Sequence, residues 1–243
     1  MKLTFLGTRG EINAKSRRHR RHAVLRVSYR GKDVMIDCGE NWRREVHRLK
    51  PHGIVITHAH PDHALGLKDG SPCMVYATED AWAGMAEYPI PKARRRTVVP
   101  RRAFTVQGIR FEAFPLEHSL RAPAVGYRII AGKADVFYAP DLVYIHDRDE
   151  ALTGTRLYIG DGATVTRSFV RKRAEHLIGH TPVRTQLTWC RKTGVPEMIV
   201  THCGSQIVKG DERVLGAKLR KMARERGVKV VIAHDGMERI LRG

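Results

Sequence analysis

Residues 53–66 read GIVITHAHPDHALG and join a short apolar run to a dense group of ionisable side chains. The run at 54–56 has the composition of a buried strand. It stops at Thr57, and His58, His60, Asp62 and His63 follow within six positions. Because a strand holds the loop after it rigidly, side chains in such a loop can act together on one target.

Imidazole nitrogens and carboxylate oxygens favour a metal site, with Zn²⁺ first and Mn²⁺ or Fe²⁺ as alternatives. Two histidines separated by one residue can face one ion, and the aspartate and histidine that follow can turn to a second. The segment has too few ligands for two ions, so others must come from elsewhere. Single ligand-type residues end three more strand-like runs, namely His118, Asp141 and His202. This recurrence predicts one shared site at a sheet edge.

Two of these assignments have rivals in the sequence. Asp161 in LYIGDGAT competes with Asp141, but Asp141 follows His118 after one hairpin-sized interval and is preferred. Asp161 is then expected to support a ligand or to cap a turn. His234 in AHDGM competes with His202 but lies beyond the last expected ligand strand.

The bulk composition is typical of a globular protein, with 243 residues and a hydrophobic fraction of 42%. No apolar run approaches the roughly 20 residues of a membrane helix. Arg9 and Glu11 come too early for the core of a signal peptide. We therefore expect a cytoplasmic protein without membrane association. The four cysteines include no C-x-x-C pair, which argues against a structural zinc site.

The net charge of +19 is unusual, since 44 Lys and Arg face 25 Asp and Glu. The basic residues cluster at 15–26, 92–102 and 167–173. Such a field favours a polyanion, and DNA or RNA is the leading partner. A small phosphorylated substrate and a merely solvated basic surface are the alternatives. The arginines expected to hold phosphates are Arg9, Arg17, Arg18, Arg20, Arg21, Arg94, Arg95 and Arg96.

Periodicity predicts a strand-rich first portion followed by alternating helices and strands, and one α/β domain over residues 1–243. Helices are expected at 40–49, 79–86, 182–193 and 211–226, and an exposed loop at 88–102. Thr181 is a plausible N-cap and Pro182 a first helical residue. Strands are expected near 2–6, 23–29, 33–37, 53–57, 73–77, 109–116, 124–130, 134–139, 156–160, 197–201 and 228–233.

The order H-x-H-x-D-H, lone His, lone Asp and final His resembles the metallo-β-lactamase-fold metallohydrolases, and the resemblance covers nearly the whole chain. The segment VMIDCG at 34–39 matches the upstream strand of that family. The resemblance implies an αββα sandwich with two metal ions at one edge. It implies that Asp141 bridges the ions and that Asp37 orients a ligand from behind. The implied ligands are His58, His60 and His118 for the first ion, and Asp62, His63 and His202 for the second.

One branch of the family resembles this chain further. The segment GHTPVRTQLTWCRKTGVPEMIVTH at 179–202 looks like the closing part of transfer-RNA 3′-processing endonucleases, with His180 in its G-H-T turn. LGT at 6–8 and AHDGM at 233–237 also look like the two ends of that branch. Only 23 positions separate His118 from Asp141 (141 − 118), which leaves no room for the long substrate arm of those enzymes. An acidic residue shortly before Asp141 is also missing. The shorter layout is closer to cyclic-phosphate phosphodiesterases and to nucleases of the family.

The function implied is hydrolysis of a phosphodiester in DNA or RNA. Two ions about 3.5–4 Å apart can share a hydroxide that attacks phosphorus in line. Asp62 would orient this nucleophile, and His180 could protonate the leaving oxygen. The alternatives are a small-molecule hydrolase, such as a cyclic-nucleotide or cyclic-phosphate phosphodiesterase, a thioesterase or a lactonase, and a metal-binding nucleic-acid module without catalysis. Homodimers are common among the proteins that this chain resembles.

Overall fold

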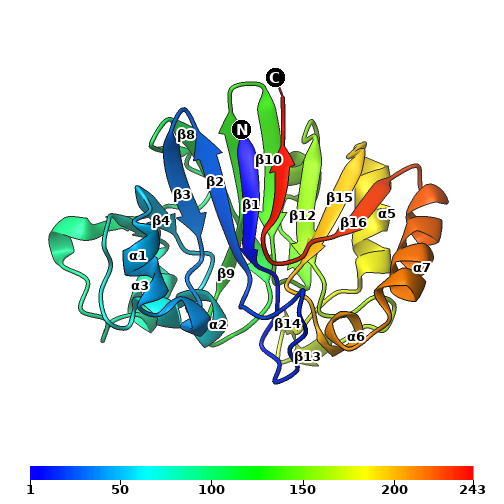
Figure 1. Ribbon diagram of the computed structural model, residues 1–243, viewed down its shortest axis with the longest axis horizontal. Helices are drawn as coiled ribbons and strands as arrows, with labels where there is room; N and C mark the ends of the chain where they lie inside the picture. Colours follow the sequence, from blue (N-terminus) through cyan, green and yellow to red (C-terminus); the bar gives the residue numbers. More distant parts are fainter. Residues whose placement is uncertain (243) are drawn as a thin grey trace.

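The computed structural model describes residues 1–242 and shows two sheets packed face to face (Figure 1). In the first sheet, neighbouring strands are antiparallel along the series β17, β1, β2, β3 and parallel along the series β3, β4, β5, β6. Its seven strands are, in order, β17 (Met237–Ile240), β1 (Lys2–Gly7), β2 (Val24–Tyr29), β3 (Lys32–Ile36), β4 (Gly53–Val55), β5 (Val75–Ala77) and β6 (Arg95–Thr97).

The second sheet has eight strands, and its strands from β10 to β16 are parallel. Its order is β11 (Tyr144–Ile145), β8 (Ile109–Glu117), β9 (Ala124–Ala131), β10 (Ala134–Ala139), β12 (Leu157–Asp161), β15 (Glu197–Thr201) and β16 (Lys229–Ile232), with β7 (Phe104–Val106) paired to β8. A separate two-stranded hairpin consists of β13 (Arg171–Arg173) and β14 (His176–Ile178).

Helices cover the outer face of each sheet (Figure 1). The first sheet carries α1 (Glu45–Leu49), α2 (Pro61–Ala64) and α3 (Glu79–Gly84), with short 3₁₀ turns at Glu40–Trp42 and Leu65–Leu67 and a third at Lys92–Arg94. The second sheet carries α5 (Val183–Thr193), α6 (Ser205–Val208) and α7 (Glu212–Arg224), while α4 (Arg148–Leu152) contacts α5. None of the helices in residues 1–242 is long and apolar enough to cross a membrane.

Three clusters of buried apolar side chains hold the two sheets and the two helical layers together. Buried side chains from both sheets meet in the middle, among them Phe5, Phe111 and Tyr127. A second cluster packs the first sheet against its helices around Trp42, and a third packs the second sheet around Leu187. The predicted αββα sandwich of the metallo-β-lactamase type is confirmed by this arrangement.

The predicted helix at 40–49 is wrong as one continuous element. The chain forms a 3₁₀ turn at Glu40–Trp42, breaks, and resumes as α1 at Glu45. Arg44 stands at the break with φ +68°, which an α-helix does not allow. The break accompanies the burial of the Trp42 indole, whose Nε1 donates to the carbonyl of His22 at 3.1 Å.

The remaining helices lie close to their predicted ranges, with adjustments at the ends. The N-cap of α5 is Pro182 and not Thr181, and the helix ends at Gly194 with φ +74°, where glycine adopts the left-handed conformation readily. Asp211 caps α7, accepting hydrogen bonds from the amides of Arg213 and Val214.

The predicted loop at 88–102 contains a strand. Residues Arg95–Thr97 pair in parallel with β5 and form the outer edge of the first sheet. An edge strand has a partner on one side only and tolerates exposed charges. A run of arginines in the sequence therefore looks like an exposed loop even where it forms such a strand. The strands β7, β11, β13, β14 and β17 were not predicted. The last of these pairs with β1, which places β17 beside the first strand of the chain (Figure 1).

Candidate metal centre

Most of the predicted ligands meet where neighbouring parallel strands end, whereas His118 follows β8, which pairs antiparallel with β9. Asp37 follows β3, and the His58–His63 segment follows β4 in the first sheet. Asp141 follows β10 and His202 follows β15 in the second sheet, while Asp161 is the last residue of β12. Parallel neighbours present their carboxyl ends at the same edge, so one edge of the sandwich gathers side chains from distant parts of the sequence.

Four imidazoles surround one carboxylate oxygen at this edge. Oδ2 of Asp141 lies 3.0 Å from Nε2 of His118 and 3.6 Å from the Nε2 atoms of His58, His63 and His202. Asp141 is 3% exposed, so this cluster is largely shielded from solvent. Imidazole nitrogens gathered around a carboxylate oxygen would suit the binding of divalent cations.

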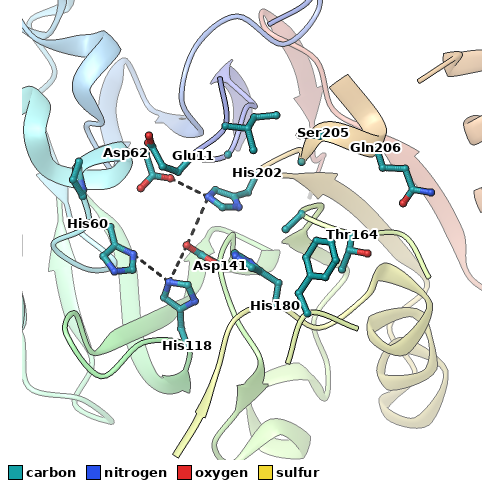
Figure 2. A pocket seen from close by; sticks show the side chains of 16 residues that line it. Glu11, His60, Asp62, His118, Asp141, Thr164, His180, His202, Ser205 and Gln206 are labelled. Carbon is teal, nitrogen blue, oxygen red and sulfur yellow. Dashed lines mark hydrogen bonds and ion pairs between the residues drawn. The ribbon is translucent and has the colours of Figure 1, made fainter. Parts of the chain in front are cut away.

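His60 and Asp62 complete two overlapping groups around Asp141 (Figure 2). Nδ1 of His60 lies 3.0 Å from Nε2 of His58 and 3.2 Å from Nε2 of His118. Oδ2 of Asp62 lies 3.1 Å from Nε2 of His202. The ligand atoms within each group lie within 4.8 Å of one another; the groups are His58, His60, His118 and Asp141, and Asp62, His63, Asp141 and His202.

The donor set fits divalent cations. Its nitrogen and oxygen atoms are those that Zn²⁺ prefers, and imidazole also suits Mn²⁺ or Fe²⁺. Nε2 of His63 is buried and makes no hydrogen bond within the described residues, although it faces Asp62 at 3.3 Å. Buried polar atoms rarely lack a partner, and a cation between these groups would provide one.

The turn after β4 aims the first four candidate ligands. His60 has extended backbone and precedes Pro61, whose fixed φ suits the first position of α2. Asp62 and His63 then lie in the first turn of that helix. Gly39 packs against the carbonyl of Asp62 so closely that a Cβ would collide with it. This approach of backbone to backbone fixes the helix against the end of β3.

Asp37 lies behind the cluster, where the sequence predicts an orienting carboxylate. Nδ1 of His63 donates to Oδ2 of Asp37 at 2.9 Å. The amide and hydroxyl of Thr57 donate to Oδ1 at 2.8 Å and 2.9 Å. Asp37 therefore fixes the strand end and the His63 ring together, turning Nε2 of His63 toward Asp141.

His180 is held between two carboxylates. Its Nδ1 lies 2.8 Å from Oδ2 of Asp161 and 2.9 Å from Oδ1 of Asp141. Asp161, at the end of β12, thus gives His180 an acidic partner, which the residues just before Asp141 do not provide. Asp161 also accepts hydrogen bonds from the amides of Leu142 and Ala163, so its carboxylate is fixed by the backbone of two separate loops.

The imidazoles of the site differ in pKa, because burial lowers the pKa of some and neighbouring carboxylates raise that of others. Burial, then the neighbouring His118, lowers the pKa of His60 to about 4, and burial also lowers the pKa of His58. Burial disfavours a charged His63, but the carboxylates of Asp62 and Asp37 outweigh it and raise the pKa of His63 to about 10. Asp161 and Asp141 likewise overcome burial and raise the pKa of His180 to about 11.

A pocket of about 460 Å³ opens onto these groups. His60, His118, Asp141, His180 and His202 line it (Figure 2). Its lining also includes residues that the sequence did not single out, namely Glu11, Ile12, Thr164, Phe169, Ser205 and Gln206. Of these, only Phe169 carried a signal, since it is an aromatic residue inside the basic segment RSFVRKR.

Arg9 does not have the exposed position expected of a phosphate contact. Its side chain is 3% exposed, and its guanidinium donates to Oδ1 of Asn41 at 3.0 Å and to the backbone carbonyls of Arg20 and Ile12. Arg9 therefore fixes the loop between β1 and β2 from inside. The expectation was wrong because the sequence does not show which member of a basic cluster turns inward.

The other predicted arginines fall into two separate regions. Arg17, Arg18, Arg20 and Arg21 are exposed on the loop between β1 and β2, whose residues Gly10–Ile12 line the pocket. Arg18 pairs with Glu212 at 3.0 Å. Arg94, Arg95 and Arg96 lie at or beside β6, on the far edge of the first sheet, and none of them lines the pocket.

Comparison with known proteins gives a family match. Residues 32–203 match the model of the beta-lactamase superfamily domain. Ribonuclease Z of Methanopyrus kandleri is 26% identical over 97% of this chain and 96% of the relative. Ribonuclease Z of Methanococcus maripaludis is 29% identical over 60% of this chain, and the match spans 58% of the relative's length.

Solved structures share the fold along nearly the whole chain. Human tRNase Z, short form, covers 100% of both chains with a TM-score of 0.67 and 19% identity. YhfI from Bacillus subtilis covers 98% of this chain and 97% of its own with a TM-score of 0.73 and 17% identity. At these identities the solved structures show the fold alone.

The match spans most of the chain, from β3 to the residue after His202. Together with the ribonuclease Z relatives, it confirms the predicted resemblance to metallo-β-lactamase-fold hydrolases and to their nuclease and phosphodiesterase branch. It also supports the prediction of a metal-dependent hydrolase. The chain belongs to the beta-lactamase superfamily.

Proposed function

We propose that this protein is a dinuclear metal-dependent phosphodiesterase that hydrolyses DNA or RNA. The observation that carries the proposal is the position of Asp141, whose Oδ2 faces four imidazole nitrogens within 3.6 Å. His58, His60 and His118 would hold one ion, and Asp62, His63 and His202 the other. Zinc is the first candidate because the ligand set is rich in imidazole.

When bound, such ions lower the pKa of coordinated water and stabilise negative charge on phosphate oxygens. The protein's own groups have separate tasks. Asp62 would orient the nucleophile, since its carboxylate faces both His63 and His202. Asp37 keeps His63 in one orientation through its Nδ1.

His180 is suited to deliver a proton to the leaving oxygen. Its Nδ1 is engaged by Asp161 and Asp141, and its side chain is 25% exposed and lines the pocket. In the metal-free protein those carboxylates overcome the effect of burial and raise the pKa of the ring to about 11, which favours its protonated form. A proton on the other ring nitrogen can then pass to the departing oxygen.

A nucleic acid is the favoured substrate because of charge and relatives. The net charge of +19 favours a polyanion, and exposed arginines at 17–21 lie on a loop that reaches the pocket. The relatives named above are ribonucleases Z. Homodimer formation, a cytoplasmic location and one domain over residues 1–243 stay predictions.

The test is a panel of end-labelled single- and double-stranded DNA and RNA, with bis-p-nitrophenyl phosphate beside it, in zinc or manganese. Cleavage of at least one polymer, abolished in His60→Ala and Asp141→Ala, supports the proposal. Full polymer cleavage by either variant would contradict the ligand assignment.

A small-molecule phosphodiesterase is the second candidate, favoured by the pocket itself. Its volume of about 460 Å³ lies within the range of small-ligand sites. Salt separates the two candidates. Binding a polymer through several phosphates weakens steeply as salt rises, whereas a small ester gives a shallow slope. Hydrolysis of small esters alone, with a shallow slope, would favour this candidate.

A further inference from the structure

The segment 167–178 forms a basic rim beside the metal centre. It contains Phe169 and the β13–β14 hairpin, which extends from the end of the sandwich near α2 and α6 (Figure 1). Phe169 lines the pocket and yet is 42% exposed. An exposed phenyl ring at the mouth of a polar site is unexplained by packing, because the buried core does not include it.

The base of this rim is hydrogen-bonded to two imidazole residues of the site. The amide of Phe169 donates to the carbonyl of His180 at 3.2 Å, and the amide of Gly179 donates to the carbonyl of His118 at 3.0 Å. Nδ1 of His118 donates in turn to the carbonyl of Gly179 at 3.2 Å. The position of the rim is therefore fixed relative to the metal centre.

Glycine is required where the rim meets the site. Gly179 has φ +107°, a conformation that other residues adopt only with strain. A Cβ there would also collide with the carbonyl of Phe169. Gly179 thus brings the Phe169 backbone against the segment leading into His180, which places the phenyl ring at the pocket.

Two arginines of the rim, Arg171 and Arg173, make no side-chain hydrogen bond or ion pair within the described residues. Lys172 pairs with Glu175 at 3.6 Å, and the guanidinium of Arg167 lies 5.8 Å from the centre of the Phe169 ring. Arg171 also lines an outer cavity of about 340 Å³ with Phe169 and His180. Arg171 and Arg173 are two positions apart on β13, so their side chains leave the same face of the hairpin.

We propose that this rim grips an unpaired stretch of nucleic acid, with a base stacked on Phe169 and flanking phosphates held by Arg171 and Arg173. Aromatic faces with adjacent cations are the common means of binding single strands. In a duplex the bases are stacked on each other, and their faces are not available to Phe169. The metal-facing groups are also recessed in the pocket, which a flexible single strand can enter.

This inference rests on the proposed function and names its substrate class. The rim lies between Asp161 and His180 in the sequence. It therefore occupies a different place in the chain from the substrate arm that is expected between His118 and Asp141 and is missing here.

The experiment compares kcat/KM for a single-stranded oligonucleotide with kcat/KM for bis-p-nitrophenyl phosphate. In Phe169→Ala this ratio should fall about fivefold or more, since stacking contributes about 1–3 kcal/mol per base. Phe169→Tyr should restore it. Arg171→Gln/Arg173→Gln should reduce the steepness with which log(kcat/KM) for the oligonucleotide falls with log salt concentration. The slope should become smaller by about 1.4, because each phosphate contact on a single strand contributes about 0.7.

The matched control for the arginine pair is Arg213→Gln/Arg224→Gln, which removes two exposed charges from α7 and should leave both the ratio and the salt slope unchanged. An unchanged ratio in Phe169→Ala, or an equal fall in the control, would overturn the inference. A blunt duplex should be cut less efficiently than the single strand, and the reverse preference would overturn it too.

Failure of the proposed function is a separate result, namely that the wild type cleaves no nucleic acid. Anisotropy of a labelled single-stranded oligonucleotide then tests the rim by itself. Weaker binding by Phe169→Ala, recovered in Phe169→Tyr, upholds the rim as a single-strand site. Equal binding by wild type and Phe169→Ala refutes it.

Discussion

At the scale of single residues, the metal centre depends on groups that hold the imidazoles from behind. Asp37 fixes His63, the carbonyl of Gly179 fixes His118, and Asp161 fixes His180. That seven ligand-type residues meet could be predicted, because each one lies in a segment that follows a strand-like run. The partner of His180 could not, since the contact joins β12 to a turn 19 positions later.

Replacing Asp37 by Asn should weaken metal binding while the fold is kept. The amide cannot accept from both Thr57 and His63 as the carboxylate does, so the His63 ring loses its fixed orientation. Loss of such an outer partner costs about 10–100-fold in metal affinity. Zinc competition against a chelator measures the change, and circular dichroism checks the fold. Wild-type affinity in Asp37→Asn would contradict this role.

The loss of activity in His180→Gln should depend on the leaving group of the substrate. An oligonucleotide leaves as a strongly basic alkoxide and needs a proton, whereas p-nitrophenolate leaves without one. We expect kcat for the oligonucleotide to fall about 10²–10⁴-fold. Hydrolysis of bis-p-nitrophenyl phosphate should change far less. Equal losses on both substrates would show that His180 has another task.

His22 should make the metal-free protein sensitive to acid. It is 2% exposed, and burial followed by the nearby Arg9 lowers its pKa to about 4. The unfolded chain, with a His pKa near 6.5, binds the proton first. Stability from neutral His22 is therefore present above pH 6.5 and lost as pH falls toward 4.

Thermal or urea unfolding of chelated protein between pH 7 and 4 measures this effect. Wild type should lose about 2 kcal/mol more than His22→Gln across that window. Parallel pH profiles for the two proteins would show that His22 does not contribute.

At the scale of elements, the sandwich was predictable where apolar periodicity is strong, as in β8, β9 and α7. It was not predictable where backbone geometry, and not apolar periodicity, determines the bounds of a helix or strand. Arg44 breaks the expected helix with a positive φ, and Arg95–Thr97 joins a sheet despite two arginines. The β13–β14 hairpin lacks an apolar alternation because it packs against no core, so its exposed residues gave no strand signal.

Asp211 should contribute to the stability of α7. Its carboxylate accepts the amides of Arg213 at 2.8 Å and Val214 at 3.4 Å. Asp211→Ala leaves these amides without an acceptor and should cost about 1 kcal/mol of unfolding free energy. Asp211→Asn keeps the acceptor and serves as the control. Urea denaturation compares the three proteins, and an equal loss in both variants would exclude capping as the cause.

At the scale of the whole molecule, charge and fold act together. Two sheets meet at an edge that gathers buried imidazoles and carboxylates, while the surrounding loops carry arginines. The charge was predictable from composition, but its distribution was not. Arg9 turns inward and Arg94–Arg96 lie on the far edge of the first sheet, so of the three basic clusters, those with a neighbouring residue in the pocket lining are the β1–β2 loop and the 167–178 rim.

The most direct measurement follows cleavage of an end-labelled single-stranded oligonucleotide as chelated protein is titrated with zinc, with bound metal counted in the same samples. The account predicts no cleavage without metal and activity that rises to a plateau at two ions per chain. In Asp141→Ala, binding of the second ion and activity should both be lost. Full cleavage after complete chelation, or none with two ions bound, would contradict the account.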